Sequence, residues 1–266
     1  MTCAHRTSRQ TAPAPLRRSS FAPRNRCTAA LFACAAFVLV AIAGCDHSPG
    51  KPGAGPLVQR PEQVLNFPTL YAQNCAACHG VNGRSGAAIS LNNAVYLAIA
   101  GAANIQQITA NGVPRTAMPP FAKSAGGMLT DQQIAALTNG MIAAWGKPDA
   151  LNGQSAPPYA TSTPANAAQG RQTFTAYCAQ CHGTDGSGGH SPGNIVTGSL
   201  VDPSYLALTS DQDLRSFILA GITEQGTHDW ISYSPSHPLT DADTTNLVTW
   251  LTSHRVAAPG QPYKQQ

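Results

Sequence analysis

Two short segments of this chain have the residue types and spacing of a covalent cofactor site. Both read Cys-x-x-Cys-His, at residues 75–79 and 178–182. In this spacing two thiols can reach the two vinyl groups of one porphyrin, and the following imidazole can face the iron. The attachments would be Cys75, Cys78 and His79 in the first motif, and Cys178, Cys181 and His182 in the second. The sequence therefore predicts two covalently bound haems c.

A zinc or dithiol site is the alternative interpretation of a Cys pair followed by His. The chain has eight cysteines, of which Cys3, Cys27, Cys34 and Cys45 belong to the N-terminal region and the other four to the two motifs. Four thiolates on one zinc would leave both histidines without a role. The haem interpretation uses every motif residue and leaves no thiol for a disulfide.

The surroundings of the two motifs repeat each other, which indicates an internal duplication. An aromatic residue precedes each first cysteine by four positions, and a glycine-rich loop follows each motif. Farther on, each half contains a Leu-Thr-Asp segment that is typical of a helix start, and a tryptophan follows near the end of that helix. The paired features are Tyr71 and Phe174, residues 129–131 and 239–241, and Trp145 and Trp250.

These patterns predict an all-α fold. Each half has a helix leading into its motif, one or two short middle helices and a terminal helix, and no segment alternates as a strand does over a useful length. Tyr71 and Phe174 lie one helical turn before their cysteines, so we expect each to pack against the terminal helix of its half.

Both halves resemble class I cytochrome c domains, and the resemblance extends over nearly all of residues 62–255. It implies two tandem class I cytochrome c-like helical domains joined by a Pro/Gly-rich linker, each holding its haem in an apolar pocket and passing single electrons. The expected boundaries are residues 62–147 for the first domain, 148–164 for the linker, 165–258 for the second domain and 259–266 for a tail.

In that family, the sixth iron ligand is usually a methionine in a loop before the terminal helix. Met118 fits this place in the first half. Met128 adjoins the Leu-Thr-Asp segment and Met141 lies within the expected terminal helix, so both fit less well. The resemblance therefore implies His79 and Met118 as the axial ligands of the first haem.

The second half contains no methionine. If Trp230 is aligned with Phe121, Thr227 takes the place of Met118 and His228 the place next to it. A shift of one residue would let His228 bind the iron opposite His182, and this is the ligand we expect. The alternatives are His237, His190 and a vacant or water-filled position.

The N-terminus carries the signal for export. Arginines precede an apolar segment at residues 29–43, and the sequence Ile-Ala-Gly-Cys at 42–45 resembles the lipobox of bacterial lipoproteins. This implies a signal peptide at residues 1–44 and a lipid on Cys45, followed by a flexible, Gly/Pro-rich stalk at 45–61. An uncleaved anchor helix is the alternative. Either would tether the exported protein to the membrane, in the periplasm or at the outer face of the cytoplasmic membrane.

The net charge of +4 comes from the presequence. Six of the 16 basic residues precede residue 45, which leaves ten basic against 12 acidic residues, so nothing indicates nucleic-acid binding.

Two functions remain open at this stage. The first is an electron carrier, not an enzyme, that transfers single electrons between membrane-associated or periplasmic redox partners, including a quinol-oxidising or terminal oxidase membrane complex. The second is a haem enzyme or small-ligand sensor that uses an open second haem. No further constellation of catalytic residues surrounds His228, which favours the carrier.

Overall fold

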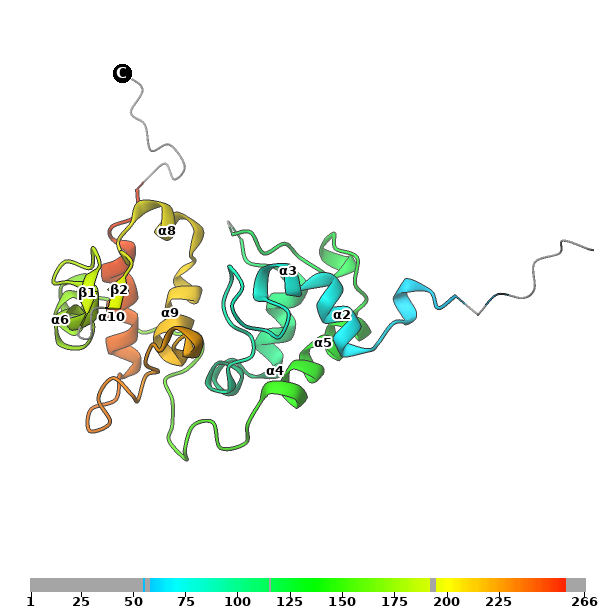
Figure 1. Ribbon diagram of the computed structural model, residues 1–266, viewed down its shortest axis with the longest axis horizontal. Helices are drawn as coiled ribbons and strands as arrows, with labels where there is room; N and C mark the ends of the chain where they lie inside the picture. Colours follow the sequence, from blue (N-terminus) through cyan, green and yellow to red (C-terminus); the bar gives the residue numbers. More distant parts are fainter. Residues whose placement is uncertain (1–54, 56–57, 115, 192–194, 257–266) are drawn as a thin grey trace, which may run out of the picture. The chain divides into compact units, whose positions relative to one another are not determined.

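The computed structural model describes residues 55, 58–114, 116–191 and 195–256 (Figure 1). The expected signal peptide, Cys45, most of the stalk and the tail lie outside the described residues. Gln59–Gln266 forms one compact unit that contains both halves. Among the residues that are described, no helix has both the length and the apolar character needed to cross a bilayer.

The first half is helical throughout its regular structure. Its elements are η1 (Pro61–Gln63), α2 (Phe67–Asn74), α3 (Ala76–His79), α4 (Ala94–Asn111), η2 (Lys123–Ala125) and α5 (Asp131–Trp145). The expected start of the terminal helix is confirmed, because Thr130 and Gln133 form a reciprocal capping box at the N-terminus of α5.

The second half repeats the order of the α-helices, with two helices in place of α4 and with one addition. Its helices are α6 (Ala167–Tyr177), α7 (Ala179–His182), α8 (Pro203–Leu208), α9 (Asp211–Ala220), η3 (Thr223–Gln225) and α10 (Asp241–Thr252). The addition is a short antiparallel pair, β1 (Gly189–Ser191) and β2 (Ile195–Thr197), in the loop after the motif. The sequence did not predict these three-residue strands, because an alternating pattern cannot be recognised over so few residues. The fold is otherwise all-α, as expected.

The duplication is visible in the middle helices. At Gly101 (φ 67°, ψ 162°) the backbone leaves the helical conformation, so α4 consists of two helical segments. They correspond to α8 and α9, which are separated by Thr209 and Ser210. The first middle helix starts in the same way in both halves, because a side-chain oxygen of Asn93 caps α4 and one of Asp202 caps α8.

In each half the terminal helix packs against the helix that leads into the motif. The ring centroids of Tyr71 and Trp145 are 5.0 Å apart, and those of Phe174 and Trp250 are 4.3 Å apart. These are the contacts that the sequence predicted. In the second half α6 and α10 lie side by side (Figure 1) and approach closely at Gly170, where an added Cβ would lie 2.0 Å from the carbonyl oxygen of Asn246.

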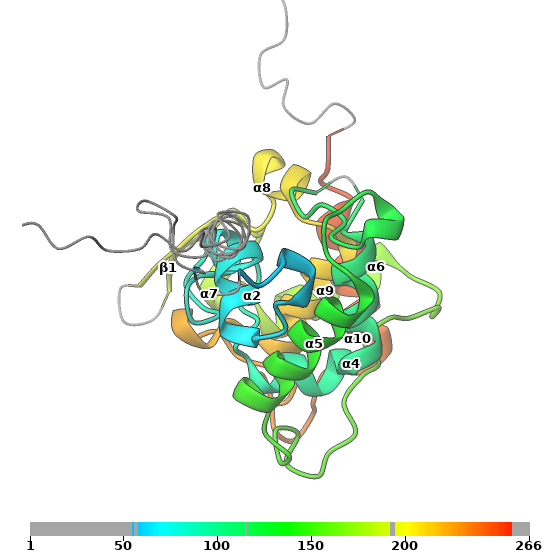
Figure 2. The same ribbon diagram turned by 90° about the vertical axis from the view of Figure 1, so that its right-hand side faces the viewer.

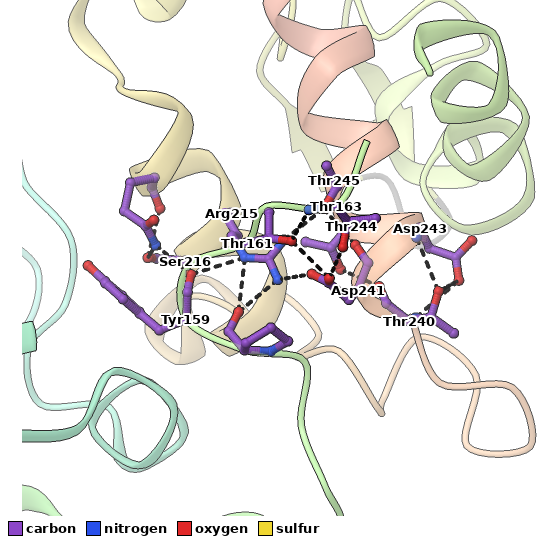
Figure 3. Close-up of polar contacts among 12 residues, drawn as sticks. Tyr159, Thr161, Thr163, Arg215, Ser216, Thr240, Asp241, Asp243, Thr244 and Thr245 are labelled. Carbon is purple, nitrogen blue, oxygen red and sulfur yellow. Dashed lines mark hydrogen bonds and ion pairs between the residues drawn. The ribbon is translucent and has the colours of Figure 1, made fainter. Parts of the chain in front are cut away.

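Part of the segment expected to be a linker is bound to the second half (Figure 3). The guanidinium of Arg215, which is 4% exposed, donates to the carbonyl oxygens of Pro158 and Tyr159 and pairs with the Asp241 carboxylate at 2.5 Å. Thr161 donates to the same carboxylate. Residues 158–161 are therefore held against α9 and α10 by charge-assisted hydrogen bonds.

Candidate functional site

The first motif spans one helical turn. Cys75 is the N-cap of α3 and is half-buried, whereas Cys78 within α3 is exposed. Neither thiol forms a disulfide with another cysteine in the part of the chain that the structure describes. Burial raises the pKa of Cys75 to about 11, and the neighbouring Cys78 adds to this effect. Both thiols thus lie on the same short turn and remain available for a covalent bond.

His79, at the end of this turn, is oriented by a backbone carbonyl. The imidazole is only 7% exposed, and Nδ1 donates to the carbonyl oxygen of Ile89 at 2.7 Å, which leaves Nε2 for a metal. Burial lowers the pKa of His79, while the bond to Ile89 and the charge of Asp213 in α9 oppose this shift. The neutral imidazole with a fixed Nδ1–H is the form that binds iron.

The second motif has the same turn but a less well satisfied histidine. Burial raises the pKa of Cys178 to about 12, with an added effect of Cys181. The Nδ1 atom of His182 is buried and has no hydrogen-bond partner among the described residues. Burial lowers the pKa of His182, and the nearby backbone carbonyl of Gly198 opposes this shift. That carbonyl does not have the geometry of a hydrogen bond to the imidazole.

The residues of both motifs fit a haem c. Each offers two free thiols and an imidazole on one turn, beside a pair of packed aromatic rings. The alternative of a single zinc bound by four thiolates does not fit the geometry. Within the described part of the chain, no three His, Cys, Asp or Glu side chains gather where they could hold a metal ion.

Of the methionines in the first half, Met118 alone lies in the loop before the terminal helix with a half-buried side chain. Its carbonyl oxygen accepts from the amide of Val113, and its own amide donates to Thr116. Met128 is 81% exposed, and Met141 lies within α5 with 2% exposure, in the core of the half. The surroundings of these three side chains favour Met118 as the axial ligand.

In the corresponding loop of the second half, Trp230 takes the place of Phe121, as the sequence alignment assumed. Phe121 accepts a backbone hydrogen bond from Leu129, and Trp230 accepts the matching bond from Leu239. Thr227 therefore lies where Met118 lies in the first half. Its hydroxyl accepts from the amide of Ile222, so this side chain serves the loop itself.

His228 is exposed and lies beside Tyr233, with ring centroids 5.8 Å apart. The pKa of Tyr233 is raised by burial and further by Cys178, Asp229 and Cys181, which indicates that its phenol lies near the thiols of the second motif. His228 thus belongs to a loop on the motif side of the domain. Tyr233 was not predicted as a site residue. The sequence does hold a signal for it, because Tyr233 lies between Trp230 and the terminal helix, whereas the first half has no aromatic residue between Phe121 and its terminal helix.

The other two candidate histidines of the second half are His237 and His190. His237 is exposed, and its Nδ1 atom lies 3.0 Å from the hydroxyl of Ser236. His190 is in β1, opposite Val196 of β2.

Comparisons with known proteins match the two halves separately. Residues 62–139 match the family described as cytochrome c oxidase, cbb3-type, subunit III, and residues 167–255 match the family described as cytochrome c. Each matched range contains one Cys-x-x-Cys-His motif.

One curated relative is the cbb3-type cytochrome c oxidase subunit CcoP of Azospirillum sp. (strain B510), with 27% identity over 152 residues. This match covers 51% of the present chain and 46% of that protein, so it spans less than half of the relative's length. Among solved structures, a reducing HAO-like protein complex of Kuenenia stuttgartiensis matches with 16% identity and a TM-score of 0.40, over 75% of this chain and 100% of that chain.

Proposed function

The chain has two cytochrome c domains and carries two covalently bound c-type haems, and from this premise we propose that it relays single electrons between redox partners. A c-type haem supplies one-electron Fe(III)/Fe(II) chemistry. One observation carries the proposal: the two motifs recur in equivalent local structures within one compact unit. A carrier needs this arrangement and no further catalytic group.

We propose Cys75 and Cys78 as the covalent attachment points of the first haem, and His79 and Met118 as its axial ligands. The buried His79 ring, fixed through Nδ1, supports this assignment, as does the half-buried Met118 in its loop. A thioether ligand raises the reduction potential of a haem. The first haem is therefore the high-potential member of the pair.

For the second haem we propose attachment to Cys178 and Cys181, with His182 and His228 as axial ligands. Support comes from the place of His228, next to the position equivalent to Met118 and in contact with Tyr233. A haem with two histidine ligands has a lower potential than one with His and Met. Electrons would then pass from the domain of residues 165–258 to that of residues 62–147.

The partner class follows from the relative. Because part of the chain is similar to a subunit named for a cbb3-type oxidase, we propose that it delivers or collects electrons beside a membrane-bound redox complex. A lipid on Cys45 would hold it there, with residues 46–61 as the stalk. Globomycin inhibition of processing, or mass spectrometry of the mature N-terminus, tests this anchor.

A second function is favoured by one observation. Thr227, whose hydroxyl is bound within its own loop, stands where the first domain has Met118, and His228 is exposed. If His228 does not reach the iron, the second haem is open to a small ligand such as peroxide, nitric oxide or carbon monoxide. The protein would then be a haem enzyme or sensor supplied with electrons by the first domain.

Carbon monoxide separates the two functions, because it binds ferrous haem only where the sixth position is vacant or weakly held. The reduced protein is exposed to the gas and the difference spectrum is compared with the haem content. No spectral change supports the carrier with two six-coordinate haems. A change that corresponds to half of the haem supports the open second site and rejects His228 as its ligand.

A further inference from the structure

Asn93 forms hydrogen bonds in both halves at once. Its Oδ1 atom accepts from the amides of Val95 and Tyr96 at 3.0 and 3.1 Å, which caps α4 in the first half. Its Nδ2 atom donates to the carbonyl oxygens of Ala220 and Gly221 at 3.0 and 3.1 Å, in the second half. The residue is 3% exposed, so both donors and the acceptor oxygen of a buried amide are used.

The carbonyls bound by Asn93 mark the start of the loop that contains Thr227 and His228. Ala220 is the last residue of α9, where helical carbonyls lack an internal partner. Gly221, with φ +65°, turns the chain so closely that an added Cβ would lie 2.7 Å from the carbonyl oxygen of His228. Asn93 therefore fixes the base of the loop proposed to cover the second haem.

On the other side, Asn93 ends the loop that orients the first motif. That loop includes Ile89, whose carbonyl holds Nδ1 of His79 at 2.7 Å. The next residue, Ser90, is 6% exposed and donates to the carboxylate of Glu224, which lies in η3 between Gly221 and His228. Two side chains of this loop thus reach the second half within four residues of each other.

Apolar packing accompanies these polar contacts. Ala220 of α9 is 3% exposed and belongs to the hydrophobic core of the first half. Val95 and Ile99 of α4 pack in turn against the core of the second half. Helices α4 and α9 are in contact, and in Figure 2 α9 lies behind the helices of the first half.

We propose that this contact, from His79 through residues 89–93 to the loop of residues 220–228, is the path of electron transfer between the two haems, and that Asn93 is the positioning residue that holds it. The inference rests on the proposed carrier function. The electron that leaves one haem, as its iron goes from Fe(II) to Fe(III), reduces the other from Fe(III) to Fe(II). The step needs no proton and no other reactant.

The second half has a matching helix cap whose side chain lacks an amide donor. Asp202 caps α8 just as Asn93 caps α4, accepting from the amides of Ser204 and Tyr205 at 2.8 and 2.9 Å. A carboxylate has no N–H to donate, so Asp202 cannot bind carbonyls of a neighbouring domain. The chain thereby contains its own matched control for the role of Asn93.

The experiment uses the full-length protein loaded with both haems and the variant Asn93→Asp. Asp caps a helix as well as Asn does, so α4 keeps its cap, while the new carboxylate faces two carbonyl oxygens. Flash reduction measures how fast the electron equilibrates between the haems, and pulsed EPR of the ferric protein measures the distance between the irons. We expect the rate to fall and the distance distribution to broaden, because the loss of two hydrogen bonds loosens this buried contact.

Two further variants complete the test. Asn93→Ser keeps a neutral cap without the amide donors, and we expect the same direction of change as in Asn93→Asp. Asp202→Asn should change neither rate nor distance. Equilibration as fast in both Asn93 variants as in the wild type would overturn the path. Failure of the carrier function itself looks different: the wild-type protein would then exchange no electrons with any one-electron donor and acceptor.

Discussion

Thr227 lies at the position in the second half that Met118 holds in the first. A Cβ added to Gly112 would lie 2.7 Å from the carbonyl oxygen of Met118, and one added to Gly221 would lie 2.9 Å from that of Thr227. The two loops therefore fold alike around a glycine with positive φ and differ in the side chain they offer. This difference is the main chemical asymmetry between the two domains, and the first two predictions depend on it.

Replacing Thr227 by Met supplies a thioether at the place of Met118. In the His228→Ala background, where the proposed histidine ligand is absent, we expect Thr227→Met to raise the reduction potential of the second haem above that of the wild type on the order of 100 mV, a small part of the ~0.8 V that axial ligands span. A potentiometric titration followed by optical spectra measures it, with Thr116→Met as a control in the loop of the first half. An unchanged potential of the second haem would show that the loop does not face the iron.

Replacing His228 by Ala removes the proposed sixth ligand of the second haem. We expect the reduced His228→Ala variant to bind carbon monoxide at half of its haem, while the wild type binds none. His237→Ala is the matched control, since His237 is exposed in the following segment, and it should behave as the wild type does. If His237→Ala opens the haem and His228→Ala does not, the ligand assignment is wrong.

Gly170 permits the close approach of α6 and α10. In Gly170→Ala the new methyl group would lie 2.0 Å from the carbonyl oxygen of Asn246, so the helices must separate. We expect a loss of about 1–3 kcal/mol in the free energy of unfolding. In Gly198→Ala the new methyl group meets no atom of the described residues within 4 Å, so this variant should change stability little. Chemical denaturation of the two variants makes the comparison, and equal stabilities would contradict the close packing.

The pair of Arg215 and Asp241 gives the stability a dependence on pH. Burial alone would raise the pKa of Asp241, but hydrogen bonds from Thr163, Thr161 and Arg215 outweigh it and hold the pKa below 3.8. Because this pKa is lower in the folded than in the unfolded protein, the stabilisation is present above 3.8 and is lost as the pH falls through the folded value.

We therefore expect Asp241→Asn to lower the free energy of unfolding by about 3 kcal/mol at neutral pH, because Arg215 is left buried without its charge partner. The difference from the wild type should shrink as the pH is lowered below 3.8. Asp211→Asn removes the more exposed partner of Arg255 and should cost less than about 1 kcal/mol. Urea titrations at neutral and acidic pH decide this, and a difference independent of pH would refute the linkage.

The covalent chemistry and the main helices could be predicted from the sequence because they depend on neighbours along the chain. Two cysteines and a histidine within five residues necessarily lie on one turn, and Thr130 and Gln133 cap a helix through bonds three residues apart. The contacts of Tyr71 and Phe174 with the terminal helices follow from the same local periodicity, since each aromatic residue lies one turn from its motif.

Only the tertiary structure decided which distant residues meet. Asn93 and Gly221 are 128 positions apart in the chain, and Arg215 reaches back to Pro158 across 57 positions. No local pattern encodes such pairs, because they depend on how whole helices pack and on which buried amides and carbonyls then need partners. In the sequence, Asn93 and Asp202 are both ordinary N-cap residues. Only the packing of the helices lets Asn93 also form hydrogen bonds between the two domains.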